Sequence, residues 1–325
     1  MELITIVTLI ISMSACLAAY IFKKVYSNIS NGGMTGVYVY SAIGCIVSAI
    51  VLLLWGGFDG FSTFTVVLGL LFGLAISLGE IFMIKAFRAG PMSFTMVIVS
   101  CSTVFTALSG FFFFEEKIGV FQLAGIAFML GSFIFATEKK DGEKKGGLVW
   151  LLFCVLSFIC SATIGFMQKT HQSSLVHKDE INTFLVLSFI VSFIFSASLA
   201  IVSMKKEKQP LFEKKNGKIY WLIPLIMVIS GICVAANHKL NLRLSGEIKS
   251  VIFFPIVNGG NLVLTMLSAL IIFKEKLTKR QWIGVALGVV SVAFLCLPID
   301  WAANFSLSDI IPEPWSYKSF INTIG

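Results

Sequence analysis

The sequence is poor in charged residues. Only 13% of its 325 residues are charged and 57% are hydrophobic, whereas a soluble domain carries roughly 25% charge. The chain therefore cannot cover itself with a surface compatible with water, and lipid must surround it. The net charge of +8 does not indicate nucleic-acid binding, because the basic residues lie in short loops between apolar runs, where they orient helices and contact anionic headgroups.

Motifs for catalysis or metal binding are also missing. The seven cysteines lie in or beside apolar runs and form no CxxC pair, so we expect neither disulfides nor a metal site. The sequence has no phosphate-binding glycine loop, no nucleophile elbow and no zinc-ligand spacing. We therefore predict that the protein is not an enzyme and needs no cofactor.

Long apolar runs are abundant. A membrane-spanning helix needs about 20 apolar residues, and ten runs fit this length; they lie at roughly 3–22, 36–56, 64–87, 91–113, 118–137, 147–167, 182–203, 220–240, 249–272 and 281–298. No soluble domain fits between them, and a tail follows at 299–325. We predict an all-α integral membrane protein with ten transmembrane helices and an extramembrane C-terminal tail.

The chain contains two copies of one unit. A constant shift pairs Phe114 with Phe273, Glu116 with Glu275, Lys117 with Lys276, Gln122 with Gln281, Gly125 with Gly284 and Ser132 with Ser291. So many identities in one register indicate an internal repeat. We place the copies at 1–138 and 147–298, with a charged linker at 139–146. Because each copy has five spans, an odd number, the second copy is predicted to lie inverted relative to the first, which is typical of transporters.

The loop charges predict the orientation. Most lysines and arginines lie in the loops that follow the odd-numbered spans, including the Lys-rich stretch at 204–219. Positive residues stay on the cytoplasmic side of a membrane. We therefore expect a multi-pass protein of the cell membrane whose two termini are extracytoplasmic.

Three sequence features resemble a known transporter family. They are two Q-x-x-G motifs that follow the elbow glutamates and a junction before the fourth run, at Gln122 to Gly125, Gln281 to Gly284 and Arg88 to Pro91. Over residues 3–298 the chain resembles the EamA-like family of the drug/metabolite transporter superfamily. The resemblance implies ten helices, an inverted repeat, and export or exchange of small metabolites or amino acids. Small multidrug pumps of the superfamily carry a carboxylate in the first helix, whereas this first run has no acid beyond Glu2, which argues against their proton-antiport mechanism.

A single acidic residue lies well inside the third run. Glu80 stands in an otherwise apolar stretch, where a charge costs at least about 2.5 kcal/mol on insertion scales. Two interpretations fit it equally: binding of substrate or a proton, or a structural polar contact. Lys85 is expected to reach toward the cytoplasmic headgroups.

The eighth run is the repeat partner of the third and is also polar. It carries Asn237, His238 and Asn241, and we assign His171 and His177 to a loop, which leaves His238 as the histidine inside a span. Histidine titrates near neutral pH and can relay protons, although polar residues also join neighbouring helices. We hypothesise that Glu80 and His238 approach one central cavity from opposed halves.

The fourth and ninth runs contain further polar candidates. These are Ser100, Ser102, Thr106, Asn258 and Asn261. The two asparagines lie on one helix face and would suit a solute with hydroxyl or carboxylate groups, while helix packing through small residues explains the same pattern equally well. The GxxxG spacings in the third and tenth runs, Gly69 to Gly73 and Gly284 to Gly288, are interpreted as packing faces.

The charged elbows of the two copies have two interpretations. Glu116 with Lys117, and Glu275 with Lys276, would form gates or ion ligands in a functional interpretation. We favour a structural one, because each carboxylate begins a helix, where free N–H groups and the helix dipole stabilise a negative charge.

The leading hypothesis is a secondary carrier that exports or exchanges a small polar metabolite or amino acid, with protons as a candidate coupling ion. A second is an exchanger of phosphorylated sugars or nucleotide-sugars, which would need lysine or arginine deep in the cavity. The only candidates, Lys85, Lys239 and Arg243, lie near helix ends, so we rank this hypothesis lower. A third is a membrane scaffold or sensor without transport. The expected partners are a small-molecule substrate and the lipid bilayer, and no nucleic acid.

Overall fold

The computed structural model describes residues 3–29, 33–89, 98–99, 101–114, 116, 118–136, 147–207, 222–272 and 278–296. Several predicted features lie outside these ranges: Ser100, Lys117, Glu275, Lys276, the linker at 139–146 and the tail at 299–325.

Ten helices form the described chain. They are α1 (Leu3–Ile29), α2 (Gly33–Gly56), α3 (Thr63–Ala89), α5 (Ser102–Phe114), α6 (Val120–Ala136), α7 (Leu148–Ser173), α8 (Ile181–Glu207), α9 (Leu222–Glu247), α10 (Ser250–Ile271) and α11 (Lys279–Cys296). Each overlaps one predicted apolar run, so the all-helical class is confirmed. Six of them, α1, α2, α3, α7, α8 and α9, are long and apolar enough to cross a membrane. The protein is a multi-pass helical membrane protein.

The helices fall into two compact units. Unit 1 comprises Met1–Ser77 and Ser174–Leu244, and unit 2 comprises Leu78–Ser173 and Ser245–Gly325. Each unit combines helices from both sequence copies, so the compact units cut across the repeat. The chain passes from one unit to the other within α3, at the end of α7 and near the end of α9.

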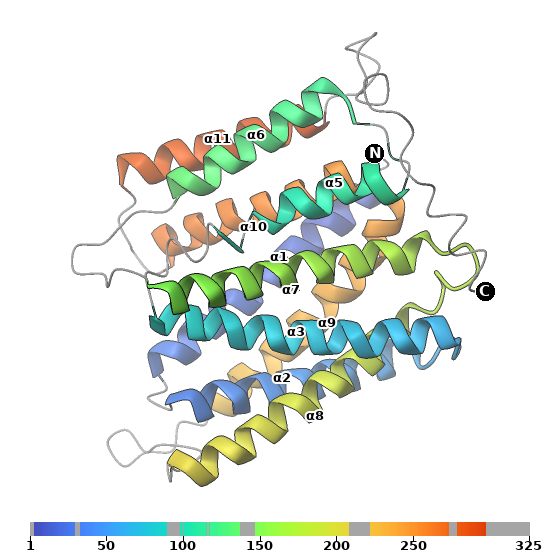
Figure 1. Ribbon diagram of the computed structural model, residues 1–325, viewed down its shortest axis with the longest axis vertical. Helices are drawn as coiled ribbons and strands as arrows, with labels where there is room; N and C mark the ends of the chain where they lie inside the picture. Colours follow the sequence, from blue (N-terminus) through green and yellow to red (C-terminus); the bar gives the residue numbers. More distant parts are fainter. Residues whose placement is uncertain are drawn as a thin grey trace. The chain divides into compact units, whose positions relative to one another are not determined.

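Helices α2 and α8 pair along their length in unit 1 (Figure 1). The hydroxyls of Thr35 and Ser203 lie 2.8 Å apart and those of Ser41 and Ser196 lie 3.2 Å apart. As the residue number rises on α2 it falls on α8, so the two helices are antiparallel. Small hydroxyl side chains allow the backbones to approach closely and add hydrogen bonds between the helices.

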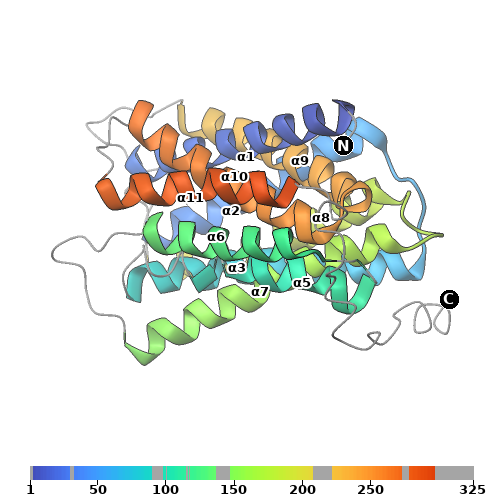
Figure 2. The same cartoon turned by 90° about the horizontal axis from the view of Figure 1, so that it is seen from above.

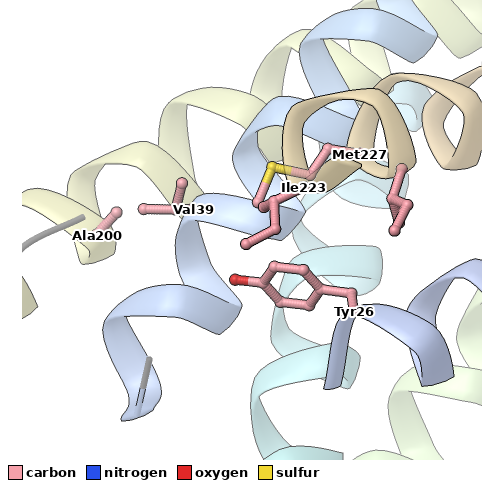
Figure 3. Close-up of a cluster of buried hydrophobic side chains, with 6 residues drawn as sticks. Tyr26, Val39, Ala200, Ile223 and Met227 are labelled. Atoms are coloured by element: carbon pink, nitrogen blue, oxygen red, sulfur yellow. The ribbon is translucent and has the colours of Figure 1, made fainter. Parts of the chain in front are cut away.

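A buried apolar cluster joins four helices of unit 1. Tyr26 of α1, Val39 of α2, Ala200 of α8, and Ile223 and Met227 of α9 are less than a tenth exposed and pack together (Figure 3). The Tyr26 hydroxyl donates to the Gly36 carbonyl at 2.9 Å. The aromatic side chain therefore fills the core while its polar end stays satisfied within the protein.

Helix α3 packs on α8 through its glycines. Ser188 Oγ donates to the Gly69 carbonyl at 2.9 Å, and Ser192 Oγ donates to the Gly73 carbonyl at 2.8 Å. A Cβ atom at Gly73 would overlap the Ser188 carbonyl. The predicted packing face at Gly69 to Gly73 is confirmed.

Helices α6 and α11 form the matching pair in unit 2 (Figure 1), and Figure 2 shows the same pair from a second direction. Ser132 Oγ donates to the Gly284 carbonyl at 2.7 Å, and Ser291 Oγ donates to the Gly125 carbonyl at 2.6 Å. The two helices therefore run antiparallel, and the residues in contact are the ones that the sequence repeat pairs. A Cβ at Gly288 would lie 2.9 Å from Val263 Cγ2 and 3.0 Å from Ser132 Oγ, which confirms that this glycine face serves close packing.

Candidate functional site

The polar residues of α5 and α10 meet in unit 2. Asn258 Nδ2 donates to Thr103 Oγ1 at 3.0 Å, and Thr103 is only 3% exposed whereas Asn258 is exposed. Asn258 lies three residues after Pro255, in the interior of an apolar helix. Asn258 therefore presents an amide group from the middle of a proline-containing apolar helix.

Two other predicted residues of this region have structural partners. Ser102 is 7% exposed and its carbonyl accepts a hydrogen bond from Thr106 Oγ1 at 3.3 Å, while the same hydroxyl also donates to the Thr103 carbonyl at 3.0 Å. The Thr106 methyl group occupies the space beside Gly165 of α7. Thr106 therefore packs α5 against α7, and its hydroxyl is satisfied within its own helix.

Asn261 lies one helical turn beyond Asn258. Its carbonyl oxygen is enclosed, and among the described residues no hydrogen-bond donor reaches it. A buried polar atom of this kind normally has a protein or water partner. The side-chain amides of Asn258 and Asn261 can thus form more hydrogen bonds than the described residues provide.

Asn237 and Asn241 of α9 bind α1 in unit 1. Ser12 Oγ donates to Asn241 Oδ1 at 2.7 Å, and Asn237 Nδ2 donates to the Ser12 carbonyl at 3.0 Å. Ser12 is fully buried. Ser12 was not among the predicted polar residues, although a serine within the apolar run of α1 is itself a signal for interhelical hydrogen bonding.

His238 lies among aromatic rings of unit 1. Its imidazole meets the Phe189 ring edge-on at 5.3 Å between centroids and the Phe72 ring edge-on at 6.2 Å. The residue is half-buried. Its neighbours on α3 and α8 therefore give the ring an aromatic environment.

Glu80 is half-buried on the part of α3 that belongs to unit 2. This part packs on α7: a Cβ at Gly79 would lie 3.1 Å from Cys160 Cβ, and the Phe82 and Phe153 rings stack with centroids 6.4 Å apart. Glu80 and His238 belong to different units, so their approach to one cavity stays a prediction.

Two of the three candidate cations rest on aromatic rings. Lys85 Nζ lies 5.5 Å from the centroid of Phe153, and Lys239 Nζ lies 4.5 Å from the centroid of Trp55. A ring face attracts a cation through its quadrupole. These lysines therefore have intraprotein partners that hold their charge, while Arg243 is exposed at the end of α9.

The elbow glutamate Glu116 is part of a buried ion pair in unit 2. Lys169 Nζ lies 2.7 Å from Glu116 Oε1, and the two side chains are 8% and 10% exposed. Glu116 also accepts a hydrogen bond from the Ser250 backbone N–H at 2.6 Å. The elbow glutamate was expected to be stabilised by the start of α6, the helix that follows it. The carboxylate instead accepts a hydrogen bond from the start of α10.

The end of α7 corrects one sequence assignment. His171 was expected in a loop, but it lies inside α7 and is fully buried. The apolar run ends near Phe166, whereas the helix continues to Ser173 because Gln168, Lys169 and Thr170 are buried by protein. Hydropathy does not distinguish burial by protein from exposure to water, so the predicted helix ended too early and Lys169 was not among the predicted residues.

Comparison with known proteins finds a family match within the second sequence copy. Residues 148–297 match the model of the EamA-like transporter family. No curated protein matches the chain. A solved structure titled only "Crystal structure of protein" aligns with a TM-score of 0.64 and 15% identity, and the alignment covers 89% of this chain and 98% of that chain. This likeness shows that the two proteins share a fold.

Proposed function

We propose that this chain, whose residues 148–297 match the model of the EamA-like transporter family, is a secondary carrier that exports or exchanges a small polar metabolite or amino acid by alternating access. The family supplies the general class, a membrane transporter of the drug/metabolite type that takes a small molecule across a bilayer. The observation that carries the finer proposal is the exposed amide of Asn258 in the interior of α10, held by Thr103 at 3.0 Å.

An inverted repeat is the architecture that we propose for this carrier. If a two-fold axis relates the two copies, every contact between equivalent helices should occur twice with the partners exchanged. The bonds from Ser132 to Gly284 and from Ser291 to Gly125 have this form. Transporters built this way place their substrate near the middle of the membrane, between repeats. Asn258 lies on α10, the helix that precedes α11 in the second copy.

The chemistry at α10 favours a polar solute without a large charge. Asn258 and Asn261 offer amide groups, which both donate and accept hydrogen bonds. Hydroxyl, ammonium and carboxylate groups of a small metabolite or amino acid can use such groups. A phosphorylated substrate would need cations deep in the cavity. Lys85 and Lys239 lie against aromatic rings and Arg243 lies near the end of α9, so the sugar-phosphate exchanger is the weaker alternative.

Glu80 is the proposed coupling residue, and His238 is a second proposed residue of the transport path. A charged acid inside an apolar membrane helix raises the free energy of membrane insertion, and such residues usually have a functional role. We propose that proton binding at Glu80 is linked to solute movement, with both termini of the protein on the extracytoplasmic side of the cell membrane. Substitution Glu80→Gln should then remove the pH dependence of transport.

Substrate binding by the purified protein tests the proposal. We expect one class of small polar metabolites to raise the melting temperature in a thermal-shift screen, and Asn258→Leu to abolish that shift. Ser198→Ala is the matched control, because Ser198 is exposed and donates to the Ile194 carbonyl of its own helix. Proteoliposomes should show counterflow of the same metabolite. If no metabolite stabilises the protein and no counterflow is found, the scaffold or sensor interpretation replaces the carrier.

A further inference from the structure

Two helix ends meet in the short connection between α9 and α10. Helix α9 ends at Glu247 and α10 begins at Ser250. The last carbonyls of a helix carry partial negative charge and the first amides carry partial positive charge, and both sets need partners outside the helix. The residue before α10, Lys249, makes no side-chain capping bond, so partners for this start must come from elsewhere.

Lys169 of α7 supplies the cation for the end of α9. Its Nζ donates to the Ser245 carbonyl at 2.9 Å and to the Ile248 carbonyl at 3.2 Å, in addition to its ion pair with Glu116. An ammonium group has three N–H donors, and these three acceptors match that number. A residue that is 7% exposed therefore keeps its charge satisfied without water.

Glu116 supplies the anion for the start of α10. Besides its bond from the Ser250 N–H, its Oε1 lies 3.3 Å from Ser250 Oγ. The Glu116 backbone N–H donates to the Gly110 carbonyl at 3.0 Å. A Cβ at Gly110 would overlap Glu116 Oε2, so a glycine at this place lets the carboxylate reach α10.

We propose that Glu116 and Lys169 are positioning residues that join the two helix ends, and that this joint works with one arrangement of charge. The cation must face the end of α9, and the anion must face the start of α10. An isolated buried ion pair contributes little to stability, because desolvation offsets the attraction. Here each charge also faces a helix end of opposite sign. The joint holds α10, and with it Asn258, against α5 and α7. This inference concerns the packing of unit 2 and does not depend on transport.

Exchange of the two charges is the decisive test. The variant Glu116→Lys with Lys169→Glu keeps an ion pair but turns both charges toward helix ends of the same sign. The neutral control, Glu116→Gln with Lys169→Met, keeps an acceptor for Ser250 and removes both charges. We expect the exchanged variant to melt below the neutral one by on the order of 5 °C, or to give no folded protein while the neutral one folds. Equal or higher melting of the exchanged variant would overturn the proposal.

A local readout separates positioning from general loss of stability. Hydrogen exchange at the amides of residues 249–258 should accelerate at least several-fold in Lys169→Met, while the amides of α2 and α8 in unit 1 stay at the wild-type rate. Lys169→Arg, which retains a cation for the end of α9, should restore most of the protection. Uniform acceleration in both units, or no acceleration at α10, would contradict the positioning role.

Discussion

Ser132 and Ser291 donate the same hydrogen bond in opposite directions between α6 and α11. Ser132 Oγ reaches the Gly284 carbonyl at 2.7 Å and Ser291 Oγ reaches the Gly125 carbonyl at 2.6 Å. Both serines are at most 1% exposed. The sequence repeat pairs the two serines and also the two glycines. Residues that are equivalent in the repeat therefore make equivalent hydrogen bonds at this interface.

The two serines should contribute equally to stability. We expect Ser132→Ala and Ser291→Ala each to lower the free energy of unfolding by about 0.6–1 kcal/mol, the range for a hydrogen bond between membrane helices. The bonds are two helical turns apart and share no partner, so the double variant should show the sum of the two effects. Thermal unfolding of the purified protein in detergent measures these losses.

Ser198→Ala is the control for loss of a serine hydroxyl, because Ser198 is exposed and bonds within its own helix. It should leave the melting temperature unchanged. A loss at only one of Ser132 and Ser291 would mean that the two contacts are not equivalent.

The glycines of α6 differ in how closely α11 approaches them. A Cβ at Gly125 would lie 2.7 Å from Leu295 Cγ and 3.2 Å from the Leu295 backbone nitrogen, whereas a Cβ at Gly131 would lie 3.5 Å from Leu287 Cδ1. We expect Gly125→Ala to destabilise by about 1–3 kcal/mol through overpacking. Gly131→Ala should be neutral or stabilising by up to about 1 kcal/mol, because alanine favours helix. The same melting assay compares them, and equal effects at both positions would contradict the close packing at Gly125.

The helices could be predicted from the sequence because their signal is simple. A run of about 20 apolar residues has few stable alternatives in a membrane, and all ten predicted runs overlap helices of the described chain. Glycine spacing likewise predicted the close contacts at Gly73 and Gly288, because only a residue without a side chain permits them.

The polar contacts were harder to predict because they join residues far apart in the sequence. Glu116 was recognised as an elbow residue, but its partner Lys169 lies on α7, beyond the end of the apolar run. Ser12 was passed over for the same reason, since its partner Asn241 is more than two hundred residues away. Hydropathy measures transfer to lipid, and it carries no information about which polar side chains face one another.

The contact between α1 and α9 gives a further prediction. Ser12→Ala removes the hydroxyl that donates to Asn241 Oδ1 at 2.7 Å, and the amide oxygen then loses that donor in a half-buried position. We expect a loss of about 1 kcal/mol in the free energy of unfolding. Ser14→Ala, two residues away, is the matched control because Ser14 is exposed and bonds to Ile10 of its own helix. Similar melting temperatures for the two variants would show that the bond to Asn241 contributes nothing.

The connection before α8 should make stability depend on pH. Glu180 accepts a hydrogen bond from Ser62 Oγ at 2.5 Å and lies 3.8 Å from His177 Nδ1. Burial raises the pKa of the Glu180 carboxyl, but hydrogen bonds from Ser62 and Thr65 and the nearby charge of His177 outweigh it, so the net pKa lies below its ordinary value. A carboxyl with a lowered folded-state pKa stabilises the fold above its unfolded pKa of about 4.3. That contribution is lost as the pH falls through the folded pKa.

Glu180→Gln should therefore destabilise the protein near pH 7, by about 0.5 kcal/mol for a contact near the surface, and should match the wild type at low pH. Melting temperatures of the two proteins, measured from pH 7 down to pH 3, should converge as the carboxyl of the wild type becomes protonated. Asp179→Asn, which changes an exposed neighbour, controls for the loss of one negative charge. A difference between Glu180→Gln and the wild type that does not shrink as the pH falls would show that the ionised carboxylate is not what binds Ser62 to the start of α8.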